Sequence, residues 1–113
     1  MQVAVVGSRT PRHSPKEIYD VLDSYDVSLL VSGGAKGVDS IAYDYAKARG
    51  IPRLVVKPDY ERFPGWVAPI IRNQVIVDYA DLVIVFWDGK SKGAHNVIKR
   101  AFNDNKACVV YEK

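Results

Sequence analysis

Three glycine-bearing turns in this 113-residue sequence carry residue types suited to binding an anion. They are Gly7-Ser8-Arg9, residues 32–37 (SGGAKG) and residues 89–93 (GKSKG), and each follows an apolar run. Glycine lets backbone approach a ligand closely because it has no Cβ. The second and third turns lead into predicted helices, whose first N–H groups suit a phosphate. The alternative is that these are short solvated turns with no ligand. Their coincidence favours one shared anion site.

Residues in and beside these turns are the first candidates for ligand contacts. They are Gly7, Ser8, Arg9, Gly33, Gly34, Ala35, Gly37, Asp88, Gly89, Ser91, Gly93 and His95. Lysines at 36, 90 and 92 would add positive charge, while His95 has the alternative of being a polar surface residue. Neither the GxGxxG nor the Walker A fingerprint is present, so an ordinary dehydrogenase or P-loop NTPase is not indicated. No cofactor and no metal are expected.

Asp39, Arg72 and Asn73 are further candidates from inside predicted helices. Asp39 could hydrogen-bond a ribose or the loop amides, or simply complement the dipole of its helix. Arg72 and Asn73 lie among apolar residues of a later helix. An arginine there is either solvent-facing or placed to bind a phosphate or carboxylate with two N–H groups. The pattern leaves both alternatives open.

Other chemistry-bearing residues give weaker signals. Asp88 and Glu61 could serve as a general base, but no carboxylate pair and no Ser-His-Asp order is recognisable. Tyr60, Phe63 and Trp66 could form an aromatic wall for a base, or cap the sheet or an oligomer contact. His13 is predicted in a mobile loop. Cys108, the single cysteine, is predicted to be a buried structural thiol.

Five short apolar runs alternate with helical patterns from end to end. The predicted strands are 2–6, 28–31, 53–56, 81–87 and 107–111, and the helices begin near residues 15, 38, 66 and 94. Residues 14–17 (SPKE) read as a capping box, and Gly50 as a helix end. This alternation predicts a single domain over residues 1–113. Its fold class is α/β, a Rossmann-like, doubly wound, five-stranded, mostly parallel sheet with helices on both faces. The three turns should then meet at one sheet edge and line a common pocket.

The composition of the chain limits the cellular compartments and the classes of partner that we expect. The net charge of +3 comes from 16 basic and 13 acidic residues without a dense basic run, which argues against nucleic acid. No apolar stretch approaches the roughly 20 residues needed to span a bilayer, so no membrane association is expected. The absence of a basic leader and of cysteine pairs predicts a cytoplasmic protein. The sequence leaves open whether the protein forms a homo-oligomer.

Four motifs, in order and with their spacing, resemble the YspA/YpsA-related branch of the SLOG superfamily. They are residues 3–9 (VAVVGSR), 31–39 (VSGGAKGVD), 71–73 (IRN) and 81–93 (DLVIVFWDGKSKG). The resemblance implies a Rossmann-like fold that binds nucleotides or nucleotide-derived ligands. It also implies that Arg72 corresponds to a substrate-proximal arginine of the LONELY GUY phosphoribohydrolases. In those enzymes the last loop carries a threonine and a catalytic glutamate, where this chain has Ala94 and Val97.

Together with the anion-binding turns, the resemblance implies a nucleotide-binding protein, with sensing as a candidate role and a nucleotide-type small molecule as its partner. The alternative is a phosphoribohydrolase that cleaves the N-glycosidic bond of a nucleoside monophosphate, with Asp88 or Glu61 replacing the missing glutamate. A further alternative is single-stranded DNA binding like that of the related protein DprA.

Overall fold

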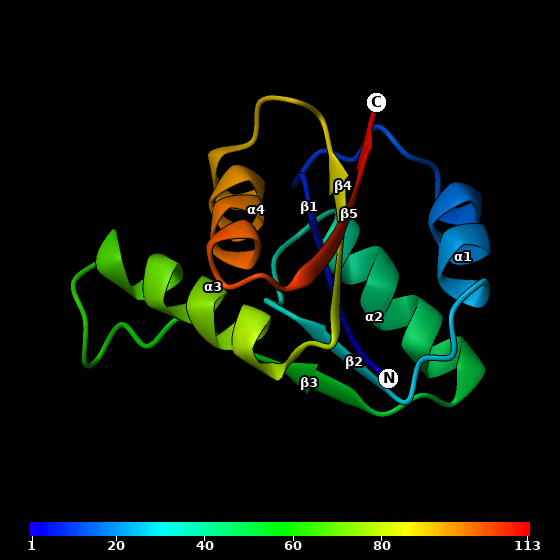
Figure 1. The fold of residues 1–113 in the computed structure, drawn as a ribbon, viewed down its shortest axis with the longest axis horizontal. Helices are drawn as coiled ribbons and strands as arrows, with labels where there is room; N and C mark the ends of the chain where they lie inside the picture. Colours follow the sequence, from blue (N-terminus) through cyan, green and yellow to red (C-terminus); the bar gives the residue numbers. More distant parts are fainter.

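The computed structural model describes residues 1–113 and contains one five-stranded sheet with the strand order β3-β2-β1-β4-β5 (Figure 1). All four neighbouring strand pairs are parallel, so the sheet is parallel throughout rather than mostly parallel. The strands are β1 (Gln2–Gly7), β2 (Leu29–Ser32), β3 (Arg53–Val55), β4 (Leu82–Trp87) and β5 (Ala107–Glu112). The helices are α1 (Pro15–Asp23), α2 (Val38–Arg49), α3 (Val67–Tyr79) and α4 (Lys92–Asn103). The predicted α/β Rossmann-like fold is confirmed.

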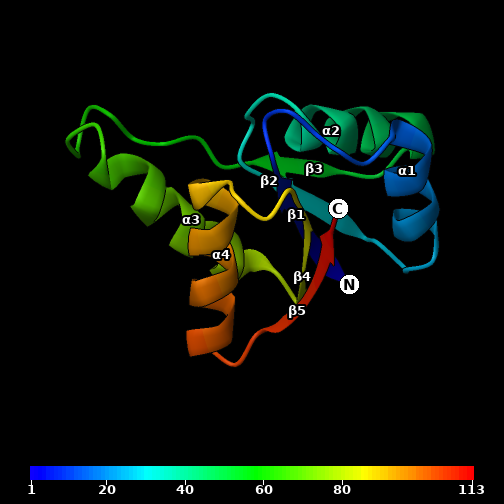
Figure 2. The ribbon, with the colours of Figure 1, turned by 90° about the horizontal axis from the view of Figure 1, so that it is seen from above.

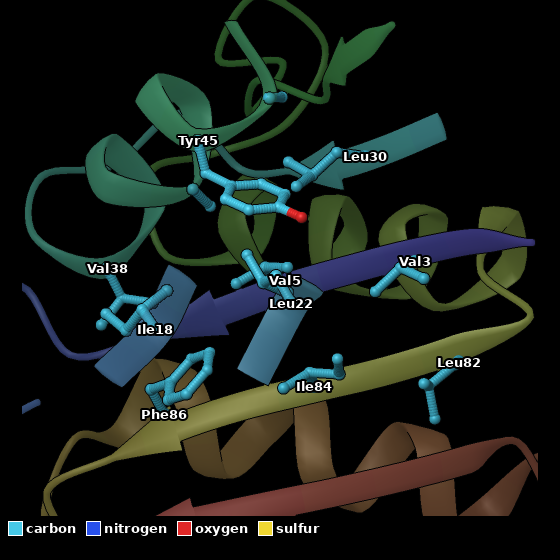
Figure 3. Close-up of a cluster of buried hydrophobic side chains, with 12 residues drawn as sticks. Val3, Val5, Ile18, Leu22, Leu30, Val38, Tyr45, Leu82, Ile84 and Phe86 are labelled. Atoms are coloured by element: carbon cyan, nitrogen blue, oxygen red, sulfur yellow. The ribbon is translucent and has the colours of Figure 1, made fainter. Parts of the chain in front are cut away.

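Two helices cover each face of the sheet. Figure 2 shows α1 and α2 on one side and α3 and α4 on the other. Beneath α1 and α2 lies a core of twelve residues that includes Phe86, Leu22 and Tyr45 (Figure 3). A second core of eleven residues, including Ile76, Val85 and Val97, lies beneath α3 and α4. Because β1 and β4 are buried on both faces, they are continuous apolar runs without alternation.

Residues near the ends of three helices have the roles that the sequence predicts. Ser14 Oγ accepts from the Glu17 N–H at 3.1 Å and Glu17 Oε1 accepts from the Ser14 N–H at 3.1 Å, which completes the capping box of α1. Gly50 ends α2 with φ +66°. Pro69 lies in the first turn of α3, where its missing N–H costs no helical hydrogen bond. None of the four helices combines the length and apolar character needed to cross a bilayer.

Two side chains differ from their predicted environments. His13 is only 8% exposed, and its ring packs edge-on against Phe86 at 5.2 Å, so it is an anchored core contact rather than part of a mobile loop. Burial lowers its pKa. Cys108 is half-buried instead of buried, because β5 is an edge strand. Partial burial raises the pKa of its thiol.

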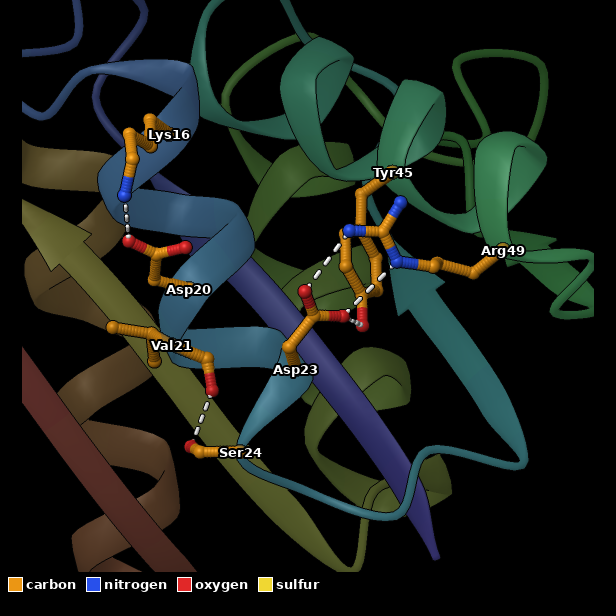
Figure 4. Close-up of polar contacts among 7 residues, drawn as sticks. All are labelled: Lys16, Asp20, Val21, Asp23, Ser24, Tyr45 and Arg49. Atoms are coloured by element: carbon orange, nitrogen blue, oxygen red, sulfur yellow. Dashed lines mark hydrogen bonds and ion pairs between the residues drawn. The ribbon is translucent and has the colours of Figure 1, made fainter.

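Polar contacts join the last residue of α1 to the C-terminal part of α2 (Figure 4). Asp23 accepts from Arg49 Nη2 at 2.9 Å and from the Tyr45 hydroxyl at 2.7 Å. The Arg49 and Tyr45 hydrogen bonds lower the pKa of Asp23 to about 2. Burial and the bond to Asp23 raise the pKa of Tyr45 to about 12. The carboxylate form of Asp23 is therefore the form that the fold favours.

This contact predicts a pH-dependent contribution to stability. The pKa of Asp23 in the folded chain is about 2, below its ordinary 3.8, so its contribution is present above pH 4 and disappears as the pH falls through 2. We expect Asp23→Asn to lower the melting temperature at pH 7 and to change it little near pH 2, since asparagine still accepts from Tyr45. Thermal unfolding followed by circular dichroism at both pH values measures this. An equal loss at both values would contradict it.

Candidate functional site

A cleft of about 320 Å³ opens at the carboxyl ends of β1, β2 and β4. From β1 the chain proceeds outward to β2 and β3, then returns across α3 to β4 on the opposite side of β1. Such a point of reversal is where open α/β sheets bind ligands. We call this cavity the switch-point cleft. Its lining residues are Val6, Gly7, Arg9, Thr10, Gly33, Ala35, Asp39, Arg72, Asn73, Ile76, Asp88, Ser91, Gly93, Ala94 and Val97.

The end of β1 is held tightly against β4 and α2. Ser8 is 2% exposed; its Oγ accepts from the Asp88 N–H at 3.1 Å, and its carbonyl accepts from the Val38 N–H at 3.1 Å. A Cβ on Gly7 would lie inside van der Waals distance of the Phe86 carbonyl oxygen and 2.6 Å from Val38 Cγ2. Gly7 and Ser8 therefore have packing roles, although Gly7 also borders the cleft.

Asp39 organises the loop after β2. Its Oδ2 accepts from the N–H groups of Gly33 and Ala35, both at 3.2 Å, and the residue is 4% exposed. Burial raises the pKa of Asp39, an effect opposed by the Ala35 hydrogen bond and by nearby Arg72. The loop-amide role, one of the alternatives for Asp39, is present in the structure. The first turn of α2 places the carboxylate where it also complements the helix dipole.

Arg72 spans the gap between α3 and the loop after β2. Its Nη1 donates to the Gly33 carbonyl at 2.8 Å and its Nε donates to Asn73 Oδ1 at 3.0 Å. A Cβ on Gly33 would lie 2.6 Å from Nη1, so glycine makes room for this guanidinium. Nη2 has no hydrogen-bond partner within the chain, and Arg72 lines the cleft. Arg72 is thus half-buried at the site and not solvent-facing.

Asn73 continues the polar contacts to α4. Its Nδ2 donates to Asn96 Oδ1 at 3.1 Å, and the same oxygen accepts from Arg100 Nε at 3.0 Å. The arrangement ties the helix that carries Arg72 to the helix whose first turn borders the cleft. Asn96 was not among the predicted site residues, although it follows His95 directly, because nothing in the sequence shows that it faces Asn73 on α3.

The first turn of α4 presents backbone donors to the cleft. The first helical hydrogen bond is from the His95 N–H to the Ser91 carbonyl, so the N–H groups of residues 92–94 have no partner in the chain. Asp88 Oδ1 accepts from the Lys90 and Ser91 N–H groups at 2.9 and 2.8 Å. These bonds lower the pKa of Asp88, which is therefore ionised at neutral pH. A Cβ on Gly93 would meet nothing within 4 Å.

The floor of the cleft is apolar. Val6, Ile76, Ala94 and Val97 line it and are at most 7% exposed. Together with Thr10, Val6 and Ile76 were not among the predicted site residues. Val6 and Ile76 belong to the second core, and no signal in the sequence distinguishes them from its other apolar members. Asp39 and Asp88 are the carboxylates that reach the cleft, whereas Glu61 is exposed and does not line it.

Several predicted contacts lie outside the switch-point cleft. Gly37 has φ +79°, and a Cβ there would overlap the Ser8 and Arg9 carbonyl oxygens, so backbone packing explains this glycine. Gly89 faces Glu112 at the end of β5. His95 is exposed and stacks on Trp87 at 5.7 Å between ring centroids. Gly34, with φ +73°, faces a different hollow beside the cleft.

Residues 1–63, more than half of the chain, match the model of the YspA, cpYpsA-related SLOG family. The chain belongs to this family. The match covers β1 through β3 and includes the first two glycine-bearing turns. No curated protein matches the sequence.

Solved structures with the same fold include two DNA processing proteins. DprA from Streptococcus pneumoniae has a TM-score of 0.78 and 23% identity, over 96% of this SLOG chain and 49% of that one. DprA from Helicobacter pylori, described for its single-stranded DNA binding mode, has a TM-score of 0.77 and 23% identity, over 97% of this chain and 64% of that one. TM1055, a structural genomics target, has a TM-score of 0.71 and 21% identity, over 95% of this chain and 71% of that one. The SLOG chain therefore spans about half to two thirds of the DprA chains, and these similarities show the shared fold.

Within the SLOG fold, the structure explains what the two departures in the last loop do. Val97 is 1% exposed and Ala94 4% exposed, and both pack in the core beneath α3 and α4. A carboxylate at position 97 would contact the cleft from its floor; valine instead extends the apolar surface there. The catalytic position implied by the resemblance thus holds no ionisable group in this chain.

Proposed function

We propose that this SLOG protein binds a nucleotide or nucleotide-derived ligand, with the ligand phosphate against the first turn of α4. Gly93 carries the proposal. Alanine stabilises helices relative to glycine by about 0.5–1 kcal/mol, and no backbone conformation or contact requires glycine here. The missing Cβ keeps open the space in front of the unpartnered N–H groups of residues 92–94. Those donors and the helix dipole favour a phosphate.

Two arginines complement this anion subsite. Arg72 has one guanidinium nitrogen without a partner, and Arg9 lines the cleft at the end of β1. The ionised Asp88 is directed to the amides of its own loop, which reduces its repulsion of an anion. A guanidinium with a free N–H edge suits phosphate oxygens.

A thermal-shift measurement with inorganic phosphate and with AMP tests the proposal. A ligand at about 100 times its Kd adds about 2.7 kcal/mol, a rise of roughly 10 °C or more in melting temperature for a domain of this size. We expect Arg72→Ala to remove the shift and Arg62→Ala, an exposed arginine outside the cleft, to keep it. No shift in the unmodified protein, or equal shifts in both variants, would contradict the proposal.

The phosphoribohydrolase alternative depends on a carboxylate near the ribose. Asp39 is engaged with loop amides, which leaves Asp88 as the candidate base. With Val97 in the floor, the site favours binding without turnover. Release of free adenine from AMP, measured chromatographically and lost in Asp88→Asn, would establish the enzyme instead.

Single-stranded nucleic acid is a second candidate partner, contrary to the expectation from charge alone. The segment before α3 projects from the body of the protein (Figures 1 and 2) and carries Trp66, 76% exposed, and Tyr60, 61% exposed, beside Arg62. Exposed aromatic rings with basic residues can stack unpaired bases, and the DprA likeness is consistent with such a use. A salt-sensitive gel shift with a labelled oligonucleotide, weakened by Trp66→Ala and unaffected by Arg72→Ala, would support this candidate over the first.

A further inference from the structure

A second hollow, of about 470 Å³, adjoins the switch-point cleft at the carboxyl ends of β2 and β3. The two cavities share Ala35 and Asp39 as wall residues. Between the middle of the β1–β4 pair and the middle of the β2–β3 pair lie two strand spacings, about 10 Å. That separation is comparable with the length of a nucleoside monophosphate. We call this cavity the side hollow.

Ser32, at the end of β2, is a buried polar side chain that lines the side hollow. The residue is 2% exposed, and its hydroxyl makes no hydrogen bond with any group of the chain. No fully buried side-chain oxygen or nitrogen of the chain lacks a hydrogen-bond partner, so the Ser32 hydroxyl oxygen is reached from the hollow. A molecule in the side hollow can therefore hydrogen-bond to Ser32 without displacing a contact within the protein.

Asp39 offers a second unpaired acceptor at the wall between the two cavities. Its Oδ2 holds the Gly33 and Ala35 amides, while Oδ1 has no partner within the chain. Asp44 and Lys57 also line the hollow. Two carboxylates against one ammonium group make this cavity less suited to a phosphate than the switch-point cleft, and the carboxylates favour a group that donates hydrogen bonds.

Tyr43 supplies a ring at the side of the hollow. The residue is 42% exposed, and the Arg53 guanidinium lies 3.9 Å from the ring centroid. A cation packed on the ring holds it in place. An aromatic ring beside carboxylate and hydroxyl acceptors provides both an apolar surface and hydrogen-bond acceptors for a sugar, and a carboxylate is a known partner for ribose hydroxyls in nucleotide-binding sheets.

We propose that the side hollow binds the ribose hydroxyls of the nucleotide whose phosphate occupies the switch-point cleft. Ser32 and Asp39 accept from the hydroxyls, and Tyr43 packs against the sugar or the base attached to it. This inference rests on the proposed function and extends it to the recognition of ribose over deoxygenated sugars.

The test compares three probes by titration calorimetry: inorganic phosphate, AMP and 2′,3′-dideoxy-AMP, which keeps the charge and base of AMP but lacks both hydroxyls. We expect AMP to bind about tenfold more tightly than the dideoxy nucleotide. Ser32→Ala should weaken AMP about fivefold and leave phosphate and the dideoxy nucleotide unchanged. Tyr43→Ala should weaken both nucleotides and leave phosphate unchanged. Tyr79→Ala, another exposed tyrosine at the far end of α3, is the matched control and should change nothing.

The outcomes separate this inference from the proposed function. Equal affinities of AMP and the dideoxy nucleotide would overturn the proposal that the side hollow binds ribose hydroxyls. Equal AMP affinities of the unmodified protein and Ser32→Ala would overturn it as well. Binding of inorganic phosphate in the same experiment would still support the proposed phosphate site at α4. Absence of binding by all three probes would overturn both.

Discussion

Gly7→Ala is expected to destabilise the protein by about 3 kcal/mol or more. The added Cβ would overlap the backbone carbonyl of Phe86 and lie 2.6 Å from Val38 Cγ2. Relief would require moving β1 away from β4 or from α2, and both neighbours are buried in the first core. The strand pairing at the switch point therefore depends on the absence of one methyl group.

Urea unfolding at equilibrium measures this loss, and Gly93→Ala is its matched control. The same methyl group at position 93 meets nothing within 4 Å and lies in a helix, so stability should be unchanged or rise by up to about 1 kcal/mol. Similar midpoints for the two variants would mean that the end of β1 tolerates the methyl group, and would contradict the packing role of Gly7.

Gly93→Asp is expected to weaken phosphate and AMP binding about 100-fold or more while leaving the fold stable. The new carboxylate would stand before the unpartnered N–H groups of residues 92–94 and take the place proposed for the phosphate. An acidic residue in the first turn of a helix is favourable for the helix itself, by about 0.3–1 kcal/mol. Loss of binding therefore cannot be attributed to unfolding.

Titration calorimetry gives the affinities, and urea unfolding verifies the stability of the same variant. The control is Gly65→Asp, which makes the same charge change at another open glycine outside the cleft. Because the net charge is equal in both variants, a general electrostatic effect would weaken binding in both. Undiminished binding by Gly93→Asp would remove the first turn of α4 from the site.

These predictions distinguish two roles of glycine that look identical in the sequence: allowing close packing within the protein, and leaving space open for a ligand. Gly7 and Gly37 are required by backbone that approaches within the protein, and Gly33 makes room for Arg72. Only Gly93 faces open space at the cleft. Close backbone approach within the protein thus accounts for Gly7 and Gly37, while contact of the glycines in the three turns with a ligand stays a prediction.

Much of the fold followed from patterns within single elements. Strands buried on both faces are continuous apolar runs, and the capping box at Ser14 and the terminal Gly50 depend on residues within a few positions of one another. Alternation of strands and helices with right-handed crossovers brings all strand ends to one edge. This alternation places Gly33 and Asp88 at that edge, whereas the pattern left Arg72 either solvent-facing or at the site, and the contact between Arg72 and Gly33 decided it.

By itself, then, the sequence determined the α/β fold, its family and the edge of the sheet where polar residues gather, because short-range periodicity decides which face of each element is buried. Only the tertiary structure decided which side chains reach the cleft. It buried His13 against Phe86, directed His95 to Trp87 and joined Asp39 to the loop amides. These contacts depend on how elements far apart in the chain are placed relative to one another. Moving a helix by one turn, or pairing a strand one residue out of register, would give each of these side chains different neighbours.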